Sequence, residues 1–198
     1  MRKTISALAL LITGFSITIF SCESSDKKKD EAKPEVVSQD SLVKRGAYLV
    51  SIMGCDDCHS PKNMTAQGPA IDKDRRLSGY PAERPMAKVT QDALKNGWML
   101  FGADLTSAVG PWGISFAANI TGDPKTGIGN WTEEQFKRAI TEGKAKGLEK
   151  GRNLLPPMPW QGFRNLHDED VKAIYTYLLS LKPVENIVPQ PIPLSQLQ

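Results

Sequence analysis

Apolar positions repeat with a helical period in several separated segments of the chain. In residues 41–54, Val43, Ala47 and Val50 fall on one face, and this spacing predicts a first helix. A short helix is also expected at residues 90–97. A terminal helix is predicted at 168–181, because an apolar stripe runs along it: Val171, Ile174, Tyr175, Leu178 and Leu181.

The helix expected within residues 131–143 has clear boundary signals. Thr132 and Gln135 form a capping-box pattern at its start, and Gly143 is a typical stop. Gly46 lies in the middle of the first helix. A glycine there lowers helix stability but permits another helix to approach closely. The two features predict well-defined helices that pack against one another.

The segments between these helices are rich in Gly and Pro, and the best strand candidates are short pieces near residues 113–120. The chain has 198 residues, of which 24% are charged and 40% hydrophobic, which fits one globular domain with appendages. We therefore expect a mainly α fold with long irregular loops. The formal charge of +3, spread through the sequence, gives no indication of nucleic-acid binding.

The N-terminal segment has the pattern of an export signal. Arg2 and Lys3 precede an apolar stretch that is short for a membrane span and ends at Cys22. The residues before Cys22 resemble a bacterial lipobox, in which the cysteine is acylated and becomes the mature N-terminus. Residues 1–21 are thus predicted to be a lipoprotein signal peptide, and the alternative is an ordinary secretory signal. The expected location is a bacterial membrane, facing the periplasm or the cell surface.

Composition divides the rest of the chain into three parts. Residues 22–40 are polar and charged and cannot bury enough apolar surface to fold, so they are expected to form a disordered tether. Residues 41–185 hold the predicted helices and form the expected domain. Residues 186–198 are rich in Pro and are interpreted as a C-terminal tail.

The remaining cysteines form a C-x-x-C-H motif. Cys55 and Cys58 are followed directly by His59. A structural zinc site would need a second pair of ligands, and His167 stands alone. A thioredoxin-type dithiol would follow a strand, whereas this motif follows a predicted helix. In a c-type haem site, two thiols add to the haem vinyl groups and the histidine ligates the iron. One covalent haem c is therefore expected.

The second axial ligand of the iron is assigned to Met158. Prolines flank it on both sides in "LLPPMPW", which makes the backbone stiff and suits a loop that holds a sulfur atom near the iron. His167 and an open coordination position are the alternatives. Four other methionines are better explained by packing or by their position: Met53, Met64, Met86 and Met99.

Three stretches together resemble class I c-type cytochromes: "RGAYLV…GCDDCHSPK", "GPWGISFAANITGDPKTGIGNWTEEQFKRAI" and "LLPPMPWQGFRNLHDEDVKAIYTYLLSLKPV". They are similar to monohaem domains related to the cytochrome subunits of bacterial alcohol and aldehyde dehydrogenases. The resemblance implies thioether links at Cys55 and Cys58, and ligation by His59 and Met158. It also implies an insertion at about residues 70–130.

The resemblance also implies a hydrogen bond to the proximal histidine and a close helix crossing. The Pro69 carbonyl would accept a hydrogen bond from the His59 imidazole, which fixes its tautomer. The first and last helices would cross closely, with Gly46 and Tyr48 facing Tyr175 and Leu178. The chain departs from the family at the start of its last helix, where His167 replaces the usual Ser or Thr cap.

These features predict an electron-transfer protein rather than an enzyme. An iron with His and Met ligands has no vacant site and exchanges electrons, and Met ligation favours the ferrous state. Expected partners are a quinol-oxidising complex, a dehydrogenase or a terminal oxidase, with the membrane reached through the lipid. One alternative is a haem subunit fixed in a dehydrogenase or oxidase complex. A peroxidase-like or gas-binding protein with an open sixth position is the other.

Overall fold

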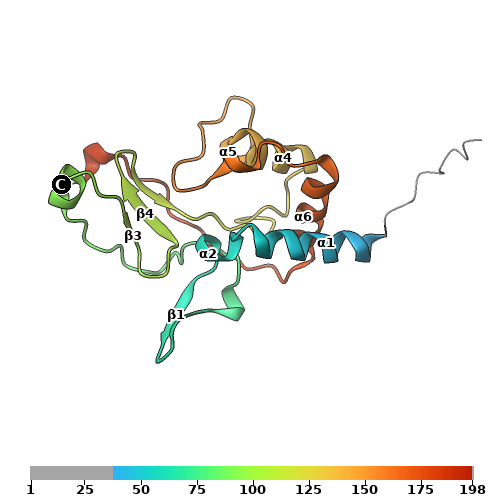
Figure 1. The fold of residues 1–198 in the computed structure, drawn as a ribbon, viewed down its shortest axis with the longest axis horizontal. Helices are drawn as coiled ribbons and strands as arrows, with labels where there is room; N and C mark the ends of the chain where they lie inside the picture. Colours follow the sequence, from blue (N-terminus) through green and yellow to red (C-terminus); the bar gives the residue numbers. More distant parts are fainter. Residues whose placement is uncertain (1–37, 198) are drawn as a thin grey trace, which may run out of the picture. The chain divides into compact units, whose positions relative to one another are not determined.

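The computed structural model describes residues 38–197, and its helices are joined by short strands and long loops (Figure 1). The predictions for residues 1–21, for Cys22 and for residues 23–37 of the tether lie outside this range. Residues 39 and 40, which were assigned to the tether, belong instead to the first helix. The elements follow one another as α1 (Gln39–Ile52), α2 (Cys55–His59), β1 (Lys62–Thr65), β2 (Gly68–Ile71), η1 (Lys73–Arg75), α3 (Gln91–Lys95), β3 (Leu100–Phe101), β4 (Ser107–Gly110), β5 (Gly113–Phe116), α4 (Glu133–Glu142), η2 (Ala145–Gly147), α5 (Trp160–Phe163), α6 (Asp168–Ser180) and η3 (Leu194–Gln196).

The first and last helices, α1 and α6, pack against each other as expected (Figure 1). Gly46 makes this possible, because a Cβ atom there would lie 2.0 Å from the Ala173 carbonyl oxygen and 2.6 Å from the Tyr177 Cβ. The residues of α6 nearest to Gly46 are thus Ala173 and Tyr177. The expected Leu178 lies in the same buried core as Leu49 and Val50 of α1, whereas Tyr175 packs against Phe136 and Tyr48 is exposed. The core of buried residues around it comprises Leu49, Val50, Leu77, Ile128, Phe136, Ile140, Val171, Ala173, Ile174 and Leu178.

We expect Gly46→Ala to destabilise the protein by about 3 kcal/mol, near the upper end for overpacking a core. Backbone atoms of α6 meet the new methyl group, so rotation of a side chain cannot relieve the clash. In an open helix the same change would stabilise by up to about 1 kcal/mol. Gly162→Ala in α5 is the control, since no atom lies within 4 Å of its added Cβ. Urea denaturation checks both variants, and equal stability of the two would contradict the close crossing.

The capping signals at α4 are confirmed. The Thr132 hydroxyl accepts from the Gln135 N–H, and the Gln135 side chain accepts in return from the Thr132 N–H. Gly143 ends the helix with a left-handed φ of 68°. His167 is the N-cap residue of α6, and its side chain makes no capping hydrogen bond. The replacement of the usual Ser or Thr by His167 thus leaves α6 without a side-chain cap.

The strands were only partly anticipated. β5 lies within the strand candidate at residues 113–120, but β3, β4 and the hairpin of β1 and β2 were not predicted. The β3–β4–β5 sheet and the β1–β2 hairpin are both antiparallel. These strands have two to four residues each, too few for an alternating pattern to be recognised. Within residues 38–197, no helix combines the length and the apolar character that a membrane crossing requires.

Residues after 185 are part of the packed domain, where the sequence suggested a tail. Asn186 is 5% exposed, and its amide donates to the carbonyls of Ser78 and Tyr80 at 2.7 and 2.9 Å. Further along, Ile192 pairs with Ile114 of β5. The proline-rich composition of residues 186–198 gave no sign of these long-range hydrogen bonds or of the short helix η3.

Candidate haem site

The C-x-x-C-H motif forms the short helix α2, which follows α1 after a sharp turn. Gly54 makes the turn with a left-handed φ of 68°, a conformation that favours glycine. Cys55 and Cys58 are three residues apart on this helix, so their thiols lie on one face. Both are free and partly exposed. Two thiols on one face, beside a histidine on the same helix, suit addition to a single planar cofactor.

His59 is oriented by a backbone carbonyl. Its Nδ1 atom lies 2.7 Å from the Ala118 oxygen, which makes Nδ1 the donor and leaves Nε2 free to bind a metal. Burial lowers the pKa of the imidazole below its usual range, and the neutral form is the one that ligates iron. The resemblance assigned this hydrogen bond to Pro69. Instead Pro69 lies in the β1–β2 hairpin, where it is exposed and pairs with Met64.

The structure also bears on the alternative readings of the motif. Burial raises the pKa of the Cys55 thiol to about 11 and raises that of Cys58, so neither has the thiolate character of a redox dithiol. Among residues 38–197, no group of three or more His, Cys, Asp or Glu side chains could hold a metal ion. Zinc therefore does not fit here, whereas two thiols and an oriented imidazole fit haem c.

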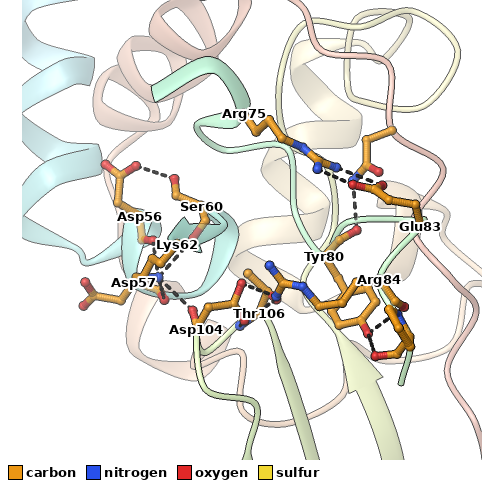
Figure 2. A network of polar contacts seen from close by, with 12 residues as sticks. Asp56, Asp57, Ser60, Lys62, Arg75, Tyr80, Glu83, Arg84, Asp104 and Thr106 are labelled. Carbon is orange, nitrogen blue, oxygen red and sulfur yellow. Dashed lines mark hydrogen bonds and ion pairs between the residues drawn. The ribbon is translucent and has the colours of Figure 1, made fainter. Parts of the chain in front are cut away.

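Polar contacts not anticipated from the sequence hold α2 in place. The Asp56 carboxylate accepts from Arg76 Nε at 2.9 Å and from a second Arg76 nitrogen at 2.6 Å, in a bidentate pair. Arg76 also donates to the Tyr177 hydroxyl at 2.6 Å, which links α2 to α6. The Ser60 hydroxyl donates to Asp56 at 2.6 Å (Figure 2). Nothing in the sequence around Asp56 indicated that its partner would be Arg76, twenty residues further along the chain.

Met158 lies in the loop between η2 and α5 and is partly buried. The loop is fixed at two places: the Leu154 N–H donates to the Gly143 carbonyl at 2.6 Å, and the Ser115 hydroxyl donates to the Pro156 carbonyl at 2.6 Å. His167, the alternative ligand, is exposed at the start of α6. The stiff loop expected around Met158 is thus present as a tethered segment.

The two predicted axial ligands are anchored to one strand. Ala118, which accepts from His59, follows β5, and Ser115, which binds the Met158 loop, lies within it. Three extended residues span roughly 10 Å, so the two anchor points are near neighbours. The strand end therefore positions both the imidazole and the methionine loop, a role that the sequence pattern did not indicate.

Comparison with known proteins agrees with this chemistry. The chain is 32% identical to the gluconate 2-dehydrogenase cytochrome c subunit of Pantoea cypripedii over 142 residues, which cover 72% of this chain and 24% of that subunit. It is 38% identical over 106 residues to the fructose dehydrogenase cytochrome subunit of Gluconobacter japonicus, covering 51% of this chain and 21% of the relative. A nicotinate dehydrogenase subunit of Pseudomonas putida matches at 44% over 79 residues, 40% of this chain and 6% of that protein. No protein-family profile matches.

The chain is a relative of bacterial dehydrogenase cytochrome c subunits. The resemblance found in the sequence is thereby confirmed. Relationship to cytochromes c implies a covalently bound haem c in this cytochrome. The chain spans about a quarter or less of the length of the relatives described. Because the match covers only part of each relative, the partner and the activity of this cytochrome do not follow from the comparison alone.

Proposed function

We propose that the protein is a lipid-anchored cytochrome with one haem c, which transfers single electrons between membrane-associated respiratory or dehydrogenase partners. The observation that carries this proposal is the hydrogen bond from His59 Nδ1 to the Ala118 carbonyl at 2.7 Å. It presents Nε2 beside the two thiols of the same helix, as a proximal ligand requires. The α1–α6 crossing beside this helix supports the fold of a class I cytochrome c.

Each site residue has a definite role in this proposal. Cys55 and Cys58 would form the thioether links, His59 Nε2 would bind one face of the iron, and the Met158 sulfur the other. The bound haem supplies one-electron chemistry, and Met ligation favours its ferrous state. Because His59 and Met158 would both ligate the iron, neither oxygen nor a substrate would have a place there.

A dehydrogenase is the best supported partner, because the similar proteins include the cytochrome subunits of gluconate and fructose dehydrogenases. The main alternative, a subunit fixed in such a complex, uses the same iron chemistry and differs in how firmly the protein is held. A lipid on Cys22, followed by a tether that ends before α1, would keep the domain near membrane partners while allowing it to move.

Spectroscopy of the full-length protein tests the proposal. We expect covalent haem that titrates as a single one-electron couple in spectroelectrochemistry, and a reduced form that does not bind carbon monoxide rapidly. Rapid carbon monoxide binding to the untreated reduced protein would favour the gas-binding or peroxidase-like alternative. Purification with a dehydrogenase in mild detergent would favour the fixed-subunit alternative.

A further inference from the structure

The side chain of Lys62 runs back along the helix that carries the C-x-x-C-H motif. Its Nζ atom donates to the backbone carbonyls of Asp57 at 2.7 Å, Ser60 at 3.0 Å and Asp104 at 2.9 Å (Figure 2). The Asp56 carbonyl lies further away, at 3.4 Å. Two of the three close carbonyls belong to the end of α2, and the third belongs to the loop between β3 and β4.

These contacts use the whole hydrogen-bonding capacity of the ammonium group. A lysine ammonium has three N–H donors, and three carbonyls lie within 3.0 Å. The carbonyls at the C-terminal end of a helix lack partners within the helix and carry partial negative charge, so a cation there is favourable. Lys62 therefore closes the end of α2, a helix of five residues with little stability of its own.

Asp104, which accepts the third hydrogen bond of Lys62, is itself held in place by other contacts. Asp104 is 5% exposed, and its carboxylate pairs with Arg84 and accepts from the Thr106 hydroxyl at 2.7 Å. The Thr106 carbonyl accepts in turn from the Ala117 N–H at 2.8 Å. Ala117 precedes Ala118, the residue that holds the His59 ring. The helix end and the imidazole are thus fastened to the same sheet by two separate contacts.

We propose that Lys62 is a positioning residue that fixes the haem-binding helix against the β3–β4–β5 sheet and raises the reduction potential of the iron. This inference rests on the proposed function. A fixed positive charge near the iron favours the ferrous state, which carries one positive charge fewer. The contact would also help to restrain the ring of His59, because it opposes rotation of the helix relative to the Ala118 carbonyl.

Two substitutions separate the charge from the contact. Lys62→Met removes both, and we expect a lower midpoint potential and a lower melting temperature. Lys62→Arg keeps the charge, but a planar guanidinium cannot direct three N–H groups to three converging carbonyls. It should lower the melting temperature while its potential stays closer to that of the wild type. Lys73→Met is the control, since Lys73 is exposed and makes no hydrogen bond or ion pair with residues 38–197.

Spectroelectrochemistry and thermal denaturation of the full-length haem-loaded proteins measure both effects. A potential of Lys62→Met equal to that of Lys73→Met would overturn the inference, even if the melting temperature fell. If Lys62→Met does not fold, a Lys62→Arg protein with unchanged melting temperature would also overturn it. Absence of haem from the wild-type protein would instead contradict the proposed function, so the two failures are distinguishable.

Discussion

Replacing both Cys55 and Cys58 with alanine is expected to abolish covalent haem attachment completely. The two thiols are the only ones that α2 carries, and both are free and partly exposed. Any haem retained by such a variant would be held by axial ligation and packing alone, and denaturation would release it. Haem staining after denaturing electrophoresis, together with the mass of the intact chain, measures the loss directly.

Cys22→Ser is the matched control, because it removes the third cysteine of the chain and leaves the motif intact. It should keep its covalent haem. If Cys22 carries the lipid, the same variant should move from the membrane fraction to the soluble fraction. Haem that stays bound to the Cys55→Ala/Cys58→Ala variant after denaturation would show that these thiols are not the attachment points.

The features that could be predicted from the sequence are those that depend on local patterns. The helical period located α1 and α6, and the capping box at Thr132 located α4 and marked its start to the residue. Gly46 was identified because a glycine inside an otherwise regular helix usually serves a close contact. Each of these signals is contained in a few neighbouring residues of the sequence.

The features that could not be predicted depend on backbone groups and distant partners. The carbonyl that orients His59 belongs to Ala118, and a backbone carbonyl has no side-chain signature. Pro69 was chosen by resemblance, but the hairpin formed by β1 and β2 carries it away from this hydrogen bond. Lys62 was not singled out, although a cation just after the end of a helix often binds the last carbonyls of that helix. Its third contact, with Asp104, requires the sheet to be known.

The imidazole and the methionine loop are tethered to one segment of the chain, which comprises β5 and the two residues that follow it. Ser115 and Ala118 hold the two sides of the proposed iron site. A common rigid support keeps both ligands in place when the charge of the iron changes. Little rearrangement should then accompany oxidation or reduction, and this suits a carrier that must exchange electrons in both directions.

Replacing Met158 with alanine is expected to abolish the weak near-infrared band that a ferric iron–thioether bond produces. The change removes the sulfur atom by which the loop would bind the iron, and the methyl group of alanine cannot act as a ligand. The midpoint potential should fall, because the thioether favours the ferrous state. With its sixth position vacated, the reduced variant should bind carbon monoxide rapidly.

Met64→Ala is the control, since Met64 is 69% exposed in β1 and has no expected role at the iron. It should keep the band, the potential and the resistance to carbon monoxide. The tethers at Gly143 and Ser115 do not involve the Met158 side chain, so the loop should keep its position in Met158→Ala. A change in the spectrum would therefore report the lost sulfur rather than a displaced loop. If the band persists in Met158→Ala, the sixth ligand is another residue, and the assignment of Met158 is wrong.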